Sequence, residues 1–453
     1  MGTTLEHQDA LVRVESDPDG GRSKISVTLT NPDIYCPSTT CETCYPIALI
    51  EKILGCKGPA YLIDEILRDE SPDYVELHLR QGILGYISEE EARGKRFLDF
   101  GCGCGSSTMV LNRIFPDSDI VGVELERDFV DVARLRSEHH GNQDRVQLLL
   151  SPHANSLPQD LGQFDFIILS GVYEHLLPRE RKQVLPQLWG CLEQGGMIFI
   201  DQTPYRWFPV ETHTTSGLPL LNYLPAVLAG PYARRFSKRK LADCDWETLL
   251  RKGIRGGSES EILRLLAGEA APSEGGAAVT PISLQPSRDG LKGHIDLWYR
   301  TSTRRSQQPL KKALYRVLKA FRAVSGVSVV PGLSLAIAKG TRGSSGGASV
   351  SDRHRNDDPA LPPRPTRSSS SRRPGPRSSA PPSARAARLA YGHQVSHHPV
   401  QPNQPITLVS DRLEPYCNKC LWGMSPYVDT SKEKVFRSAQ SRTEQLFHFD
   451  CDC

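Results

Sequence analysis

Apolar residues recur at two different spacings along this chain of 453 residues. Between Arg96 and Asp201, short apolar runs alternate with stretches in which apolar residues stand three or four positions apart. The runs predict buried strands, and the wider spacing predicts amphipathic helices. Strands that alternate with helices of about 10–15 residues form right-handed βαβ units. The pattern therefore predicts a parallel, doubly wound α/β sheet, with strands at RFLDF, DIVGVE, RVQLLL, FDFIILS and GMIFID.

The segments before and after this alternation carry different patterns. Residues 1–32 are polar and rich in Asp, Gly and Thr, which indicates a disordered leader. Apolar residues take helical spacing in YPIALIEKIL and AYLIDEIL, so residues 33–92 are predicted to form an N-terminal helical lid. The sheet domain itself is predicted over residues 93–305. It contains an insertion at about 203–290, whose first part is rich in Pro, aromatic residues and His.

The end of the sheet domain is predicted to add two strands. VTPISLQP and GHIDLWYRT are separated only by a short turn, which favours an antiparallel pair. They complete a Rossmann-like sheet of seven strands in which the last is antiparallel. Residues 306–339 then hold a basic amphipathic helix at 310–324 and an apolar segment. Residues 340–406 are a Ser/Pro/Arg-rich tract, predicted to be a disordered linker, and residues 407–453 form a Cys-containing C-terminal segment.

Composition and charge narrow the possible function classes. The formal net charge is +3, and this near-neutral balance argues against a nucleic-acid partner. The first residues contain no apolar core of the kind that a secretory signal carries, and no apolar stretch reaches the ~20 residues of a membrane span. Twelve cysteines are too few for a disulfide scaffold. We therefore expect a cytoplasmic protein with reduced thiols.

One motif carries the chemistry. The strand Phe97–Phe100 is followed by Gly101-Cys102-Gly103-Cys104-Gly105, and a predicted helix comes next. Glycines here permit positive φ angles and let backbone N–H groups approach a ligand closely. Glu124 ends the next strand, nineteen residues after Gly105, near the offset at which an acid meets ribose hydroxyls. The combination predicts a site for a nucleoside-containing cofactor.

The spacing of the motif resembles that of the class I S-adenosylmethionine-dependent methyltransferases. Their turn reads G-x-G-x-G with an acid two residues ahead, and Asp99 stands there in this chain. The likeness continues through Phe164-Asp165-Phe166-Ile167-Ile168, Tyr173-Glu174-His175-Leu176 and Leu192-Glu193-Gln194-Gly195-Gly196. It implies S-adenosylmethionine as the cofactor, with the turn against its methionine part, Glu124 on the ribose and Asp99 steadying the turn.

The resemblance implies further cofactor contacts around the same turn. The residues assigned to the cofactor are Asp99, Gly101, Cys102, Gly103, Gly105, Glu124, Leu125, Ala154, Asn155 and Ser170. One position departs from the family pattern. His153 stands where an Asp often accepts a hydrogen bond from the adenine amino group. Adenine recognition is therefore expected to rest on Ala154 or Asn155.

The acceptor of the methyl group is expected at the carboxyl ends of the fourth and fifth strands, where α/β proteins bind ligands. Glu174, His175 and His213 are the candidate catalytic residues there, with His175 or His213 as the general base. A second interpretation of Glu174-His175 is a pair at a helix start that only packs near the cofactor. Tyr205, Arg206 and Glu211 also belong to this region.

The acceptor chemistry is predicted from the residue types in this region. The mixture of His, aromatic and Arg residues favours O-methylation of a polar small-molecule, saccharide or lipid-linked acceptor. The stretch TPYRWFP is loosely similar to bacterial family members found with cell-surface saccharide or lipid modification. A protein that kept the fold only as a binding or scaffold module is one alternative. An N-methyltransferase of a small molecule or protein is the other, although Ser170-Gly171-Val172-Tyr173 replaces the Asn/Asp-Pro-Pro-Tyr motif of many such enzymes.

Cysteine spacing and the basic helix leave two further alternatives open. The spacing of Cys36, Cys41 and Cys44, with Cys56 as a fourth ligand, resembles a ferredoxin ligand set, and a structural zinc site is a further alternative there. Four cysteines near the C-terminus could make a four-thiolate zinc site: Cys417, Cys420, Cys451 and Cys453. Ordinary thiols are the favoured interpretation, and no metal is assigned. The basic helix at 310–324 is interpreted as a solvated face, with peripheral membrane contact as the alternative.

Overall fold

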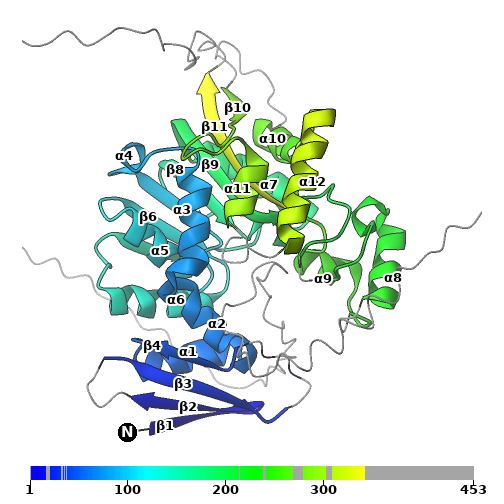
Figure 1. Cartoon of the computed structure of the whole chain (residues 1–453). Coiled ribbons are helices and arrows are strands. Elements are labelled where there is room, and N and C mark those ends of the chain that lie inside the picture. The colour runs from blue at the N-terminus through cyan, green and yellow to red at the C-terminus, as the bar shows by residue number, and fades with distance from the viewer. Residues whose placement is uncertain are drawn as a thin grey trace, which may run out of the picture. The chain divides into compact units, whose positions relative to one another are not determined.

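The alternation of strands and helices builds one twisted sheet, drawn at the centre of Figure 1. The structure, a computed structural model, describes residues 2–16, 21–31, 34, 36, 38–213, 215–237, 241–268, 279–301 and 309–341. The sheet has seven strands in the order β10-β11-β9-β8-β5-β6-β7. Their bounds are β5 (Arg96–Phe100), β6 (Asp119–Glu124), β7 (Val146–Leu150), β8 (Phe164–Ser170), β9 (Leu192–Pro204), β10 (Val279–Ser283) and β11 (Gly332–Thr341).

The five strands β5 to β9 are parallel, and β11 pairs antiparallel with both β9 and β10. The prediction of a Rossmann-like, doubly wound sheet of seven strands is confirmed. Its central strands are covered on both faces, because Phe97 of β5 belongs to one buried cluster while Leu98 and Phe100 belong to the other. The main covering helices are α5 (Ser106–Ile114), α6 (Arg127–His140), α7 (Pro178–Gly190) and α10 (Glu259–Ala267).

The predicted final pair of strands is half wrong. VTPISLQP supplies β10, but GHIDLWYRT forms the helix α11 (His294–Thr301). Its buried positions, Ile295, Leu297, Trp298 and Thr301, recur at helical spacing, which the aromatic and β-branched composition concealed. The last strand is β11, from the apolar segment placed outside the domain. The sheet therefore extends past the predicted boundary at residue 305.

Residues 1–32 also depart from the prediction, because they are not a disordered leader where the structure describes them. They form β1 (Gly2–His7), β2 (Ala10–Ser16) and β3 (Ser23–Leu29), which join β4 (Thr40–Thr43) in an antiparallel sheet. The alternation of Ala10, Val12 and Val14 with polar residues gives this sheet one buried face. In a half-buried strand only every second residue needs to be apolar, so the polar composition of residues 1–32 wrongly indicated disorder.

The helices predicted over residues 33–92 are present. They are α1 (Ile47–Lys57), α2 (Pro59–Glu70), the π-helical turn η1 (Pro72–Glu76), α3 (Leu77–Leu84) and α4 (Glu89–Ala92). The small sheet packs on α1 and α2, while Leu79 and Ile83 of α3 join the core of the large sheet. This lid is therefore part of the folded domain, and Figure 1 shows the small sheet below it.

The segment after β9 is less regular. It holds the short 3-10 helix η3 (Leu221–Tyr223), α8 (Ala226–Phe236) and α9 (Trp246–Arg251), and η2 (Tyr173–His175) is a similar turn after β8. The basic helix predicted at 310–324 is present as α12 (Pro309–Ser325). No helix in the described part of the chain combines the length and apolar character needed to cross a membrane. The predicted linker at 340–406 lies outside the described residues except for Gly340 and Thr341, which end β11, and the segment 407–453 lies wholly outside them.

Candidate functional site

The glycine turn, Gly101–Gly105, connects β5 to α5. Its three glycines have φ angles of +74°, +56° and +83°, in the left-handed region that glycine adopts without strain. Two residues at its start are anchored to the neighbouring strand, because the N–H groups of Gly101 and Cys102 both donate to the carbonyl of Val123. The turn therefore opens at the carboxyl edge of β5 and β6, where α/β proteins bind ligands.

Steric contacts separate the roles of the three glycines. A Cβ on Gly101 would lie 2.7 Å from Val172, and one on Gly105 would lie 2.7 Å from the Cβ of Ala133 in α6. Packing inside the chain therefore requires glycine at both positions. A Cβ on Gly103 would meet no atom of the described residues within 4 Å. The central glycine is thus the one that close packing of the chain does not explain.

Glu124 lies at the end of β6 and reaches the same turn. Its carboxylate accepts hydrogen bonds from the N–H of Gly103 at 2.8 Å and from the N–H of Leu125 at 2.7 Å. The side chain is half-buried, and it belongs to the turn in space as the sequence motif predicted. The N–H of Glu126 also donates to this carboxylate at 3.3 Å. A carboxylate held by backbone donors at this edge is positioned to exchange them for hydroxyl donors of a ligand.

Asp99 supports the turn from below. It is buried, and its carboxylate accepts hydrogen bonds from the hydroxyls of Ser107 at 2.6 Å and Thr108 at 2.7 Å. Burial raises the pKa of Asp99 to about 6, against the effect of the two hydroxyl donors. This carboxylate thus ties the end of β5 to the first turn of α5, and it holds the turn without facing outward.

The other predicted cofactor residues lie near this edge. The N–H of Ser151 donates to the carbonyl of Glu124, which places the loop holding Ala154 and Asn155 beside it. Ser170 ends β8, and its hydroxyl accepts a hydrogen bond from Gln202. Leu125 is 42% exposed. Their positions agree with a site at the carboxyl ends of β5 to β8, and their assignment to the cofactor stays a prediction.

A buried arginine that the sequence analysis missed joins the lid to the glycine turn. Arg136 of α6 is fully buried and donates to the Cys104 carbonyl, the Ser106 hydroxyl and the Glu65 carboxylate. Burial would raise the pKa of Glu65, but Arg136 and other cations lower it to about 2. No sequence signal marks this residue, because an arginine on an amphipathic helix usually faces solvent.

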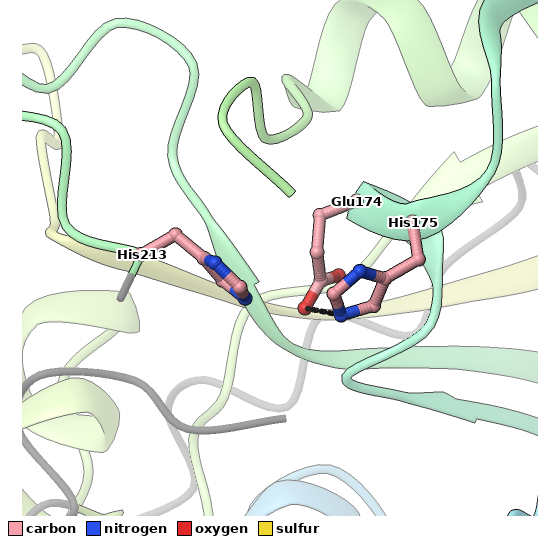
Figure 2. Close-up of side chains that lie close together, drawn as sticks. All are labelled: Glu174, His175 and His213. Carbon is pink, nitrogen blue, oxygen red and sulfur yellow. Dashed lines mark ion pairs between the residues drawn. The ribbon is translucent and has the colours of Figure 1, made fainter. Parts of the chain in front are cut away.

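The candidate catalytic residues meet in space. The histidine cluster, defined here as Glu174, His175 and His213, combines η2 with a loop that follows β9. One ligand atom from each residue lies within 4.8 Å of the others, and His175 Nε2 stands 3.8 Å from Glu174 Oε1. Figure 2 shows His213 pointing toward the other two from the opposite side. Glu174 and His213 are buried, and burial raises the pKa of Glu174.

Surrounding backbone and hydroxyl groups fix the orientation of this cluster. His175 Nδ1 is hydrogen-bonded to the Arg251 carbonyl at 2.6 Å, and His213 Nδ1 is hydrogen-bonded to the Thr215 hydroxyl at 2.9 Å. The Thr203 hydroxyl donates to Glu174 Oε2 at 3.0 Å. Gly253 closes the cluster, because a Cβ there would lie 3.0 Å or less from His213. No sequence motif marks Arg251, Thr215 or Gly253 as part of this cluster.

Two other residues of this region have different roles. Glu211 is buried, and its Oε2 accepts hydrogen bonds from the N–H and hydroxyl of Ser216 and the N–H of Gly217. Burial raises the pKa of Glu211 to about 7. This residue therefore holds the loop that carries His213. Arg206 is half-buried, and burial lowers the pKa of its guanidinium.

The alternative of a cysteine ligand set near the N-terminus gains no geometric support. Among the residues that the structure describes, the histidine cluster is the one group whose side chains could together hold a metal ion, and Cys36, Cys41 and Cys44 do not converge. Cys41 lies in β4, where burial raises the pKa of its thiol to about 12. The cysteines at 417, 420, 451 and 453 lie outside the described residues.

Comparisons with known proteins agree with this geometry. Residues 98–198 match the family model "Methyltransferase domain". Over 105 residues the chain is 30% identical to a probable fatty acid methyltransferase of Pseudomonas putida, covering 23% of this chain and 26% of that protein. Over 157 residues it is 27% identical to the carboxy-S-adenosyl-L-methionine synthase of Chromohalobacter salexigens, covering 34% and 53%.

Solved structures show the same likeness over a similar share of the chain. An S-adenosylmethionine-dependent methyltransferase of Clostridium acetobutylicum matches with 17% identity and a TM-score of 0.26, covering 32% of this chain and 56% of that one. The chain therefore spans between about a quarter and about half the length of these relatives. The family match spans residues 98–198, which include the glycine turn, and it supports an S-adenosylmethionine-dependent methyltransferase domain in this part of the chain.

Proposed function

We propose that this protein transfers the methyl group of S-adenosylmethionine to an oxygen atom of a polar acceptor, which binds beside the histidine cluster. One observation carries the proposal. Val172 closes over the glycine turn, where Gly101 leaves no room for a Cβ, and Tyr173-Glu174-His175 follow directly. One packed residue, Val172, therefore separates the turn from the cluster. Methyl transfer requires the donor site and the acceptor site to be adjacent in this way.

The glycine turn and its neighbours have separate roles toward the cofactor in this proposal. Glu124 accepts hydrogen bonds from the ribose hydroxyls, and Gly103 leaves space for the methionine part. Asp99 keeps the turn in place, and Ala154 with Asn155 borders the adenine. The support is that Glu124 and Gly103 already meet in a 2.8 Å hydrogen bond at the open edge of the sheet.

Oxygen is the proposed acceptor atom because of what surrounds the cluster. Methyl transfer is an in-line displacement at carbon, so the enzyme has to align the acceptor and remove the proton of a hydroxyl. The cluster offers a carboxylate and two imidazoles for that second task. Arg206 adds a buried Nη1 that has no hydrogen-bond partner in the described structure, which favours an acceptor with further oxygen atoms. A saccharide or lipid-linked molecule in the cytoplasm meets these requirements.

The test supplies methyl-labelled S-adenosylmethionine to the purified full chain together with a cell extract. Label is then counted in the lipid, saccharide, protein, nucleic-acid and small-molecule fractions. We expect base-stable label in a saccharide or lipid fraction. A Glu124→Ala variant should lose the labelling at low cofactor concentration. Label that stays only in a nucleic-acid or protein fraction would contradict the proposed acceptor class.

Variants of the two histidines test the proposed role of the cluster. His175→Ala and His213→Ala should each lower turnover by about a hundredfold or more, since a positioned proton acceptor contributes about 10²–10⁴-fold. Affinity for S-adenosylhomocysteine, measured by calorimetry, should stay the same. Full turnover in both single variants and in the double variant would remove the cluster from the mechanism. A chain that binds the cofactor but labels no fraction would instead be a binding or scaffold protein.

A further inference from the structure

We propose that Glu174, His175 and His213 form a binding site for one divalent transition-metal ion of the Zn²⁺ or Co²⁺ type. The binding site itself does not depend on the proposed methyl transfer. Its use, to bind and acidify the acceptor hydroxyl, does rest on the proposed function. The neighbouring groups determine which ring nitrogen of each histidine carries the proton.

His175 is fixed in one tautomer. Its Nδ1 lies 2.6 Å from the carbonyl oxygen of Arg251, and a carbonyl can only accept a hydrogen bond. Nδ1 therefore carries the proton. In the neutral ring Nε2 then presents a lone pair, and this atom lies 3.8 Å from Glu174 Oε1.

His213 is fixed in the same way, through one intervening hydroxyl. The Thr215 hydroxyl donates its single proton to the carbonyl of Lys252. Toward His213 Nδ1, at 2.9 Å, it can therefore only accept, so Nδ1 carries the proton here too. In the neutral ring the lone pair is again on Nε2. Hydrogen-bonded Nδ1 atoms of this kind are typical of metal-binding histidines.

Two imidazole lone pairs and a carboxylate thus converge, with their ligand atoms within 4.8 Å of one another. A divalent cation placed among these acceptors could bind all three at once. Gly253 blocks one side, and a Cβ there would lie 2.9 Å from His213 and 3.1 Å from Glu174. Around Zn²⁺, ligand atoms at about 2.1 Å from the ion stand roughly 3.4 Å apart. Small side-chain movements would therefore complete the coordination.

The donor set indicates the type of ion. Imidazole nitrogen suits Zn²⁺, Co²⁺ and Fe²⁺ better than Mg²⁺ or Ca²⁺, which prefer oxygen ligands. Three protein ligands also leave a coordination position open, as in catalytic zinc sites.

The open position would take the acceptor hydroxyl. The ion lowers the pKa of a bound O–H, so the proton leaves to solvent water and an alkoxide remains. The alkoxide oxygen then bonds to the methyl carbon while the carbon–sulfur bond of the sulfonium breaks. The products are the methyl ether and S-adenosylhomocysteine. With the ion bound, the two histidines act as its ligands, and the ion takes over the acidification of the hydroxyl that the proposed function assigns to the cluster.

The site is tested by titrating the chelator-treated full chain with Co²⁺, followed by visible absorption, and with Zn²⁺, followed by calorimetry. Glu174→Gln, His175→Gln and His213→Gln should each weaken binding of this ion by more than about a hundredfold, because each removes a ligand. The control His139→Gln changes an exposed histidine of α6 and should leave binding unchanged. Thr215→Val should weaken binding about tenfold or more, and Thr215→Ser should restore it.

Affinity for S-adenosylhomocysteine, measured on every variant, shows that the domain is folded and keeps the two proposals separate. The site is supported if the three cluster variants lose the stoichiometric Co²⁺ absorption signal but still bind S-adenosylhomocysteine. Absence of binding in the wild type, or equal binding in all three variants, overturns it. Equal methyl transfer with and without the ion would overturn the ion's role in catalysis and leave the proposed function standing.

Discussion

The glycine turn and the histidine cluster lie at the same edge of one sheet, yet they are assembled in opposite ways. The turn is one continuous stretch plus Glu124, and its backbone N–H groups bond within the same two strands. The cluster draws on η2 and on the loop at 211–217, with orienting groups from β9 and α9. A site built from one continuous segment can therefore be recognised in the sequence as a motif. A site assembled from distant segments appears in the sequence only as isolated polar residues.

Removing Arg136 should cause the largest loss of stability, because the glycine turn depends on a buried ion pair that lies outside its own motif. Arg136→Met would leave Glu65 and Asp69 buried without their main counter-charge. Breaking a buried pair in this way costs about 3–5 kcal/mol of unfolding free energy. Urea denaturation should show that loss. Arg134→Met, two residues earlier and half exposed, should cost under about 1 kcal/mol, and equal losses would contradict the idea.

The loop that carries His213 should instead make stability depend on pH. The pKa of Glu211 is raised from 4.5 to about 7, so the folded protein binds its proton more tightly than the unfolded chain. The stability that this proton provides is complete below about pH 4.5 and is lost as the pH rises through 7. At about 1.4 kcal/mol per pH unit over this interval, the loss of unfolding free energy is about 3.5 kcal/mol.

Denaturation of wild type and Glu211→Gln at pH 5 and pH 8 measures this contribution. The variant should be more stable than wild type at pH 8 and similar to it at pH 5. Glu193→Gln changes an exposed acid and should behave as wild type at both values. Parallel pH profiles for wild type and Glu211→Gln would show that the carboxyl does not titrate in this range.

Glu124→Ala tests the turn as a binding element. A carboxylate that accepts hydroxyl hydrogen bonds gains about 1.5–3 kcal/mol, so affinity for S-adenosylmethionine should fall by about ten- to a hundredfold. Calorimetry measures the change. Glu126→Ala, a nearby acid whose side chain makes no cap hydrogen bond, is the control. Unchanged affinity in Glu124→Ala would remove this residue from the cofactor site.

Two glycine variants have the smallest expected effects and separate cofactor binding from packing within the turn. Gly103→Ala should cost only about 1–2 kcal/mol of stability, from the left-handed backbone, but should weaken cofactor binding. Gly105→Ala carries the same backbone cost and also collides with Ala133, so its thermal midpoint should fall further. Equal midpoints for the two variants would mean that the contact with α6 relaxes freely.

The sequence predicted the parts of this molecule that follow local rules. The strands β5 to β9 were predicted from their apolar runs, and Glu124 from its distance to the turn. The helix α11 was not, since a short buried aromatic segment fits either period. The strand β11 was not, since its pairing depends on β9, which is distant in the sequence. His175 and His213 were suggested as candidates, but their shared orientation depends on Arg251 and Thr215, which carry no signal of their own.

The position of β11 has a consequence for synthesis on the ribosome. The chain emerges from its N-terminus onward, so β5 to β9 can pair long before residues 332–341 are made. Until then one edge of β9 presents unpaired N–H and C=O groups beside the segment that leads to His213. The nascent chain is thus most open to wrong strand pairing during this interval, and any fragment that ends before Gly332 keeps that edge exposed.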